Sequence, residues 1–317
     1  MAVYVNTNYS ALQGQRYLGN VQNSLTTTYQ RLSSGMRINS AKDDAAGLQI
    51  ADRLTSQING LNQGNRNASD GIALAQTVEA GMDEISGMLQ KIRTLAVQAN
   101  NGTNTMDDRK SLAKEASSLA TEISRIAMQT TFAGKTVLNG KQANSIDPIA
   151  GGNQGGGGKG EAQNITLQVG SNKGDTISFN LVNLQFSIAA SKAGVDKDKV
   201  SAQGGDNVAF KAAGGTVTVN FSTSARVADI IGYMDQMISY VDGQRADLGA
   251  IQNRLESSIR NQSNVAANEA DARSRIRDAD FAEESANLSQ QSIIQQAAAS
   301  MLMQANTRPQ LGLSLLG

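Results

Sequence analysis

The sequence of 317 residues contains no Cys, no His and no Trp, and these absences exclude much of the chemistry of catalysis and metal binding. Without Cys the chain has no thiol nucleophile, disulfide or zinc thiolate site, and without His it lacks the commonest general base. Ten Met residues remain, but Met234, Met237, Met301 and Met303 stand at helix-core spacings, where flexible thioethers fill gaps in packing. The composition therefore predicts no cofactor, no metal site and no enzymatic activity.

Net charge and long apolar runs are missing as well. Lys plus Arg and Asp plus Glu each number 28, so the chain has no global positive field that would attract nucleic acid or an anionic membrane. No apolar run approaches the roughly 20 residues of a membrane-spanning helix. Residues 1–10 (MAVYVNTNYS) have neither the basic start nor the apolar core of a secretory signal peptide. We therefore expect no nucleic-acid partner, no membrane insertion and no export through a cleaved signal.

Two Gly-containing stretches fail as phosphate loops. In residues 151–160 (GGNQGGGGKG), Asn153 stands six positions before the Lys where the pattern needs Gly, and Gly160 follows where it needs Ser or Thr. Residues 134–136 (GKT) end like such a loop, but Gln129 stands at the position of its first Gly. The first stretch is expected to be a loop and the second a solvated turn.

Residues 269–284 (EADARSRIRDADFAEE) concentrate acids and bases that could suggest acid–base catalysis. Arg273, Arg275 and Arg277 alternate with other residues among the Asp residues of this segment. The pattern favours ion pairing between neighbouring subunits or a solvated helix junction.

Both ends of the sequence are predicted to be helical, because they are rich in Ala, Gln, Asn, Ser and Leu and nearly free of Pro and Gly clusters. The first helix carries an apolar stripe at three-and-four spacing and should end at Gly35. That stripe consists of Leu18, Val21, Leu25 and Leu32. A second helix is expected over about residues 44–100. A third should begin near Asp107, whose carboxylate can cap free backbone N–H groups.

The C-terminal part holds a seven-residue apolar frame that spans more than four heptads. Its members are Met234, Met237, Val241, Leu248, Ile251, Leu255 and Val265, with Gln244, Ser258 and Gln262 as polar exceptions. Heptads sustained over such a length predict a coiled coil, which requires a partner stripe. The N-terminal helices offer one within the same chain, so we expect the two ends of the sequence to lie side by side.

The middle, from about residue 139 to 223, is rich in Gly and in short alternating runs. Apolar and polar residues alternate on both sides of a turn at residues 170–174 (GSNKG), which predicts a β-hairpin. The alternating residues are Ile165, Leu167 and Val169 before the turn and Ile177, Phe179 and Leu181 after it. The predicted fold is therefore mainly α: a long antiparallel, coiled-coil helical rod formed by both termini, with a β-hairpin and a small β and loop insert in the middle.

The outermost segments are almost uncharged. Residues 1–41 contain Arg16, Arg31 and Arg37 but no acid, and residues 285–317 contain only Arg308. Helices buried in an assembly avoid the desolvation cost of unpaired charges. We therefore expect these ends to be mobile in the monomer and to become ordered on association.

The terminal segments resemble one known family, the bacterial flagellins. Residues 31–58 (RLSSGMRINSAKDDAAGLQIADRLTSQI) look like the N-terminal signature of that family. Residues 272–281 (ARSRIRDADF), followed by residues 295–297 (QQA) and 305–306 (AN), are similar to its C-terminal signature, and residues 309–316 (PQLGLSLL) resemble its usual ending. The resemblance covers about residues 1–140 and 226–317, and the hairpin also fits.

The resemblance implies three domains. Residues 1–43 with 277–317 would form a terminal inner-tube helical domain, residues 44–184 with 223–276 a helical rod with the β-hairpin, and residues 185–222 a short variable outer insert. In the inner domain, subunits would pack through Leu18, Val21, Leu25, Leu32, Leu288, Ile294 and Leu302. In the rod, Met234, Met237, Val241, Leu248, Ile251 and Leu255 would form the intrachain coiled coil.

The resemblance also implies partners. These are further copies of the chain, hook-associated and cap proteins, and a cytoplasmic export chaperone that binds the C-terminal helix, with export by the flagellar type III apparatus to an extracellular flagellum. A vertebrate Toll-like receptor recognises members of the family through a helix that corresponds to residues 89–98 and through one further contact. The matching residues are Gln90, Arg93, Leu95, Gln98 and Glu115, whereas Lys91 stands where recognised members usually carry Arg.

The expected function is that of a structural subunit that polymerises into the bacterial flagellar filament used for motility. Head-to-tail contacts that do not close would generate an open helix. Two alternatives stay open at this point: a hook–filament junction protein of the same family, and a non-flagellar coiled-coil scaffold or adhesin.

Overall fold

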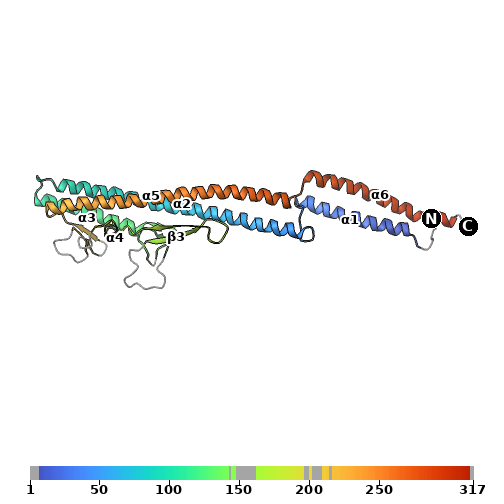
Figure 1. Ribbon diagram of the computed structural model, residues 1–317, viewed down its shortest axis with the longest axis horizontal. Coiled ribbons are helices and arrows are strands. Elements are labelled where there is room, and N and C mark those ends of the chain that lie inside the picture. Colours follow the sequence, from blue (N-terminus) through green and yellow to red (C-terminus); the bar gives the residue numbers. More distant parts are fainter. Residues whose placement is uncertain are drawn as a thin grey trace. The chain divides into compact units, whose positions relative to one another are not determined.

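The computed structural model describes residues 7–142, 144–147, 162–195, 200–201, 209–213 and 216–314 (Figure 1). Within these residues the helices are α1 (Tyr9–Ser34), α2 (Ala45–Ala99), α3 (Met106–Gln129), α4 (Phe186–Lys192), α5 (Ser224–Arg277) and α6 (Phe281–Ser314). The strands are β1 (Thr131–Phe132), β2 (Lys135–Thr136), β3 (Gln163–Gln168), β4 (Thr176–Leu181), β5 (Val200–Ser201), β6 (Phe210–Ala213) and β7 (Thr216–Val219). The predicted mainly α fold with small β elements is confirmed. Among the described helices, none has the length and apolar character that crossing a membrane requires.

The chain divides into two compact units. One consists of residues 1–59 together with 264–317, and the other of residues 60–263. One boundary lies within α2 and the other within α5, so each of these two helices contributes to both units. Each unit therefore joins an N-terminal part of the chain to a C-terminal part.

In the unit of residues 60–263, α2 and α5 run antiparallel (Figure 1). Partner positions rise along one helix as they fall along the other: Glu79 with Gln252 (2.9 Å), Asp83 with Arg245 (3.0 Å) and Arg93 with Asp235 (2.5 Å). Between these polar contacts the two helices share one apolar core. The α5 residues of that core include Met234, Met237, Val241 and Leu248, and the α2 residues include Val78, Met82, Ile85, Leu89 and Ile92.

The seven-residue frame of α5 faces inward as far as Gln262, which is 8 % exposed, and then shifts by one residue. Leu255 is fully buried and Ile251 half-buried, whereas Val265 is 36 % exposed and its neighbour Ala266 only 9 %. The prediction that Val265 lies in the seam was therefore wrong. A straight helix has 3.6 residues per turn, so a seven-residue repeat drifts around its surface unless the helices supercoil.

The ends of two helices illustrate how local sequence sets their limits. Gly35 follows α1 with φ of 69°, the left-handed conformation that Gly adopts without steric cost. The helix α3 is capped by Thr105 and not by Asp107, because Thr105 and Asp108 form a reciprocal capping box. Hydrogen bonds from the Thr105 hydroxyl and backbone N–H hold the pKa of Asp108 below its ordinary value. The predicted start of the helix was correct to one residue, but the capping residue was wrong.

The predicted β-hairpin is confirmed. Strands β3 and β4 pair antiparallel with Ile165 opposite Phe179 and Leu167 opposite Ile177. Ile165 and Phe179 face the core shared with α2 and α5. The turn between the strands lies against α2, where Gly60 and Gly64 leave room for the backbone of residues 169–171.

Residues 185–222 contain the helix α4, which the sequence analysis did not predict. Seven residues are too few to establish a helical period. Phe186 of α4 and Phe210 of β6 are both fully buried, with ring centroids 5.1 Å apart in an edge-to-face contact. The apolar side chains of α4 and β6 therefore pack into the core of residues 60–263.

The close contact between α2 and the hairpin gives a testable prediction at Gly64. A Cβ atom at this position would overlap the carbonyl oxygen of Val169, a backbone atom that cannot turn aside as a side chain can. We expect Gly64→Ala to lower the free energy of unfolding by about 1 to 3 kcal/mol, measured by urea denaturation. Gly87 of the same helix has nothing within 4 Å of a Cβ, so Gly87→Ala is the control and should stabilise by about 0.5 to 1 kcal/mol. Equal effects of the two substitutions would contradict this account.

Candidate assembly surfaces

In the unit of residues 1–59 and 264–317, α1 and α6 lie side by side and run antiparallel (Figure 1). Asn8 Nδ2 donates to the Ala305 carbonyl over 2.7 Å at one end of the pair, and Arg31 binds Glu284 at the other. Leu302 packs closely on Gly14, where an added Cβ would lie 3.3 Å from the Leu302 Cδ1 atom. Because Gly14 has no side chain, α6 can pack closely against α1 at this position.

The residues predicted to pack between subunits occupy different environments in this helix pair. Val21 is buried, and Leu18, Leu25, Leu32, Leu288 and Leu302 are half-buried. Ile294 is 39 % exposed. Six of the seven thus lie on partly or fully covered faces within the single chain, and Ile294 does not.

The opposite faces of α1 and α6 expose large apolar side chains. Of thirteen exposed large hydrophobic residues among those described, nine lie on these two helices. They are Tyr9, Leu12, Tyr17 and Tyr29 on α1 and Phe281, Ile293, Ile294, Met301 and Met303 on α6. Ile293, Met301 and Met303 are each about two-thirds exposed or more, at 67 %, 71 % and 66 %. Exposed apolar surface of this extent is typical of an interface with another molecule.

The two short segments with distinctive sequence, residues 31–58 and 272–281, meet at the junction of α5 and α6. The backbone N–H groups of Arg37 and Ile38 both donate to the Arg277 carbonyl, over 2.7 and 3.3 Å. The Arg37 side chain donates to the Ile276 carbonyl over 2.7 Å, and the Ala279 N–H donates to the Gly35 carbonyl over 3.0 Å. These bonds fix the loop after α1 to the loop before α6.

The Arg residues of segment 269–284 form ion pairs and hydrogen bonds within the chain. Arg277 lies 3.9 Å from Asp52 of α2, and Arg275 pairs with Asp271 one turn away on α5 over 3.0 Å. Of the two interpretations that the sequence left open, a helix junction fits these contacts. Sequence reasoning missed that the two distinctive segments contact each other, although both lie where a helix was expected to end.

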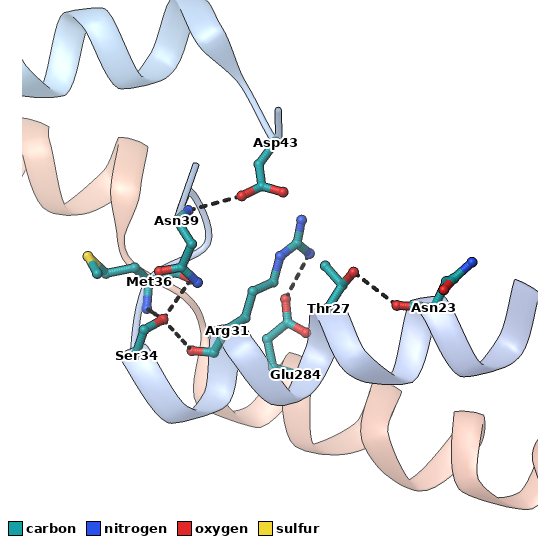
Figure 2. A network of polar contacts seen from close by, with 8 residues as sticks. All are labelled: Asn23, Thr27, Arg31, Ser34, Met36, Asn39, Asp43 and Glu284. Atoms are coloured by element: carbon teal, nitrogen blue, oxygen red, sulfur yellow. Dashed lines mark hydrogen bonds and ion pairs between the residues drawn. The ribbon is translucent and has the colours of Figure 1, made fainter. Parts of the chain in front are cut away.

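One ion pair joins α1 to α6 near this junction (Figure 2). Arg31 Nη1 donates to Glu284 Oε1 over 3.1 Å, and the Glu284 side chain is only 9 % exposed. The Arg31 Nε and Glu284 Oε2 atoms are buried and have no hydrogen-bond partner among the described residues. In the loop beyond, hydrogen bonds from Ser40 and Asn39 hold the pKa of Asp43 below its ordinary value.

The residues predicted to contact a receptor lie on α2 and α3. Gln90, Arg93, Gln98 and Glu115 are exposed, and Leu95 is half-buried against the core. Arg93 does not point freely into solvent, because its guanidinium binds the Asp235 carboxylate. Any partner that uses the Arg93 side chain must therefore compete with this ion pair.

The structure bears on two kinds of site that the sequence analysis considered, a metal site and a phosphate loop. Within residues 7–142, 144–147, 162–195, 200–201, 209–213 and 216–314, no group of three or more acidic side chains could hold a metal ion. Residues 134–136 form the turn and second strand of the β1–β2 hairpin, with φ of 78° at Gly134. The Gly-rich stretch at residues 151–160 lies outside the described residues.

Comparison with known proteins identifies what the two ends of the chain are similar to. A family model of the bacterial flagellin N-terminal helical region matches residues 5–143, and one of the bacterial flagellin C-terminal helical region matches residues 231–316. Flagellin B of Vibrio cholerae is 37 % identical over 377 aligned positions, and polar flagellin C of Vibrio parahaemolyticus is 36 % identical over 390. Both alignments cover 100 % of each chain. A solved structure described as a flagellar hook-associated protein of Vibrio parahaemolyticus shares the fold, with 17 % identity, a TM-score of 0.53, and coverage of 74 % of this chain and 100 % of that one.

Proposed function

The chain belongs to the bacterial flagellin family and is a structural subunit of the flagellar filament, and we propose that the exposed faces of α1 and α6 are the surfaces through which it polymerises. The observation that carries this proposal is the concentration of exposed apolar side chains on these two helices. Burying each Ile or Met in a neighbouring copy contributes roughly 1.5 to 3 kcal/mol. Repeated contacts of this kind in one direction generate an open helical filament.

The proposal extends to the three parts expected from the sequence. Residues 1–43 with 277–317 form the inner layer of the filament, residues 44–184 with 223–276 the next layer, and residues 185–222 the outer part. The near absence of charge in the first and last segments supports the inner position, because an unpaired charge there would have to be desolvated. In that layer the half-buried Leu18, Leu25, Leu32, Leu288 and Leu302 and the exposed Ile294 would contact neighbouring copies with the area that the single chain leaves uncovered, and Val21, which is buried within the helix pair, would support that surface from inside.

The proposed function also includes a route by which the chain leaves the cell. The filament is extracellular, and we propose that the chain reaches it through the flagellar type III apparatus. A cytoplasmic chaperone would bind α6 before export and cover Ile293, Met301 and Met303, which would otherwise drive premature association. Its release at the export gate would leave the same side chains free to polymerise.

Ile293→Ala tests the assembly surface. Ile293 is 67 % exposed in the single chain, so the substitution should leave the free energy of unfolding of the monomer unchanged. We expect the critical concentration for polymerisation to rise about tenfold, because apolar area buried between subunits is lost. The measurement is sedimentation of polymer over a concentration series, and Gln290→Ala, at an exposed polar position of α6, is the control. An unchanged critical concentration would remove Ile293 from the interface.

A second role, recognition by a vertebrate Toll-like receptor, is favoured by the exposure of Gln90, Arg93, Gln98 and Glu115. The ion pair between Arg93 and Asp235 would have to be broken before the guanidinium could bind an acidic group of a receptor. We therefore expect Asp235→Asn to increase receptor activation by depolymerised protein a few-fold, since exposed ion pairs are worth about 0.2 to 1 kcal/mol. Arg93→Ala should abolish the response. A cell reporter assay with both variants checks this, and wild-type protein that gives no response at high dose would end the proposal.

A further inference from the structure

The dipeptide Asn-Gly occurs three times in the chain, and it is able to undergo a chemical reaction without any enzyme. The three sites are Asn59 with Gly60, Asn101 with Gly102, and Asn139 with Gly140. The backbone nitrogen that follows an Asn can attack the side-chain amide of that Asn. A following Gly hinders this attack least, because it has no Cβ atom and moves freely in φ and ψ. The three sites are equivalent in sequence, so differences between them come from the fold.

Three structural conditions favour the reaction. The backbone around the Asn must be free to rotate until the next nitrogen reaches the side-chain carbon. That nitrogen must lose its proton, which a hydrogen bond from its N–H group to an acceptor opposes. Water must reach the site, because solvent accepts the proton and later completes the hydrolysis.

The first site lies in the interior of α2, where the helix opposes the reaction. The Asn59 side chain is exposed, but the N–H of Gly60 belongs to the hydrogen-bonded backbone of the helix. The hairpin turn also packs on this position, because a Cβ atom on Gly60 would lie 2.7 Å from the Ser171 Cβ atom. The backbone here cannot rotate unless α2 opens.

The third site is held by amide side chains from other parts of the chain. Asn139 Oδ1 accepts a hydrogen bond from Gln185 Nε2, and the Asn139 carbonyl accepts one from Asn183 Nδ2 over 2.9 Å. Gln163 Nε2 donates to the Gly140 carbonyl over 2.9 Å, and Gly140 itself is buried. Both the rotation of the backbone and the access of water are therefore restricted.

The second site meets all three conditions. Asn101 and Gly102 lie in the loop between α2 and α3, and both are exposed. Neither the side-chain amide of Asn101 nor the N–H of Gly102 has a hydrogen-bond partner in the part of the chain that the structure describes. The backbone bonds nearby run from the Asn101 N–H to the Gln98 carbonyl (3.1 Å) and from the Asn104 N–H to the Asn101 carbonyl (3.2 Å). These bonds leave the attacking nitrogen free.

Another exposed loop shows why a free nitrogen matters. Asn39 is exposed and is followed by Ser40, a small residue. The N–H of Ser40, however, donates to the Asp43 carboxylate over 2.9 Å, and the Asn39 side chain donates to the Met36 carbonyl over 3.2 Å. Exposure in a loop is therefore not sufficient, and this Asn is expected to be stable.

We propose that Asn101 is a site of spontaneous deamidation. The Gly102 nitrogen loses its proton to solvent and forms a bond to the Asn101 side-chain carbonyl carbon. The bond from that carbon to Nδ2 breaks, and the leaving nitrogen takes up protons from water and departs as ammonia. Water then opens the resulting five-membered imide at either of its two carbonyl carbons, which gives aspartate or isoaspartate. In sum, one amide and one water become one carboxylate and one ammonium ion.

The product has a structural consequence at the end of α2. It places a negative charge directly after a helix whose last turn contains no basic residue. The free carbonyl groups at a helix C-terminus carry partial negative charge, so the new carboxylate repels them. Isoaspartate in addition lengthens the loop backbone by one atom. We therefore expect faster hydrogen exchange over residues 96–99 after the reaction.

The test is incubation of the depolymerised full-length chain in mildly alkaline buffer, followed by peptide mapping with mass spectrometry. We expect residue 101 to convert at least about tenfold faster than residues 59 and 139. In concentrated urea the three sites should react at rates within about a few-fold of one another, because the contacts that protect two of them are lost. The site lies in the unit of residues 60–263, so this result does not depend on polymerisation.

Gly102→Ala is the decisive variant. A Cβ atom at this position meets nothing within 4 Å, so circular dichroism and the free energy of unfolding should stay close to wild type while conversion of Asn101 slows at least about tenfold. Gly87→Ala, at a position equally open in the middle of α2, is the control and should leave the rate at Asn101 unchanged. Conversion of Asn59 or Asn139 as fast as Asn101 in the folded chain would overturn the proposal, and so would a rate at Asn101 that does not respond to Gly102→Ala.

Discussion

Deleting residues 276–317 is expected to abolish filaments completely while leaving a folded, soluble protein. The deletion removes α6 and with it half of the helix pair that carries most of the exposed apolar side chains. Residues 60–263 keep their own core of α2, α3, α5 and the strands. Ultracentrifugation and negative-stain microscopy should find no polymer at any concentration, and a cooperative thermal transition followed by circular dichroism should remain.

The same deletion should also release α1. In the intact chain α6 is the element that covers the α1 stripe at Val21, and a helix of 26 residues with little charge is marginal in water without such a cover. Hydrogen exchange over residues 9–34 should therefore be faster in the deletion variant than in the intact chain, and exchange over α2 should stay slow in both. Deleting residues 1–41 should have the converse effect on α6. Filaments of normal diameter formed by either deletion variant would contradict the assembly proposal.

Much of the fold could be predicted because its signals are local or strictly periodic. The apolar frame from Met234 to Leu255 predicted the buried face of α5, because every heptad places apolar residues at the same core positions. The alternation around residues 170–174 predicted the hairpin, because a strand period of two places alternate residues such as Ile165 and Phe179 on the buried face.

The errors arose where tertiary contacts decide the outcome. The helix α4 is short, and it is held by the contact of Phe186 with Phe210, which lies 24 positions later in the sequence and gives no local signal. Val265 satisfied the frame in the sequence, but the seam had already drifted by one residue at that point. The capping role of Thr105 could have been recognised from the Thr-x-x-Asp pattern, which Asp107 obscured.

The assembly surface was only partly predictable for a related reason. The sequence shows that α1 and α6 carry few charges and several apolar residues, but it does not show which apolar residues pack between the two helices. Leu18 and Leu302 turned out to be partly covered within the chain, whereas Ile293 remained exposed. The pairing of Arg31 with Glu284 could not be found from spacing, because 253 positions separate them.

Glu284→Ala is expected to weaken filaments strongly without unfolding the core of residues 60–263. The substitution leaves the Arg31 guanidinium without its carboxylate at a site where the Glu284 side chain is 9 % exposed and the Arg31 side chain 32 %. Breaking a buried pair by removing one partner costs about 3 to 5 kcal/mol, and the partial exposure of Arg31 places the loss here at about 2 to 3 kcal/mol. If ordered α1 and α6 are required for addition to the filament, the critical concentration should rise roughly 30- to 150-fold.

Two further variants distinguish the effect of breaking the ion pair between Arg31 and Glu284 from the effect of removing one negative charge from α6. Glu283 is the neighbouring acid, exposed on the same first turn of α6, so Glu283→Ala removes one negative charge without breaking the bond to Arg31 and should change the critical concentration less than about threefold. Arg31→Met combined with Glu284→Leu replaces both partners by apolar groups and should recover most of the loss, because no buried charge is left alone. If the Glu283 and Glu284 variants polymerised equally poorly, the negative end-charge of α6 would be the cause, since carboxylates in a first helical turn favour the helix through its dipole. Recovery in the double variant alone would instead locate the effect in the pairing of α1 with α6.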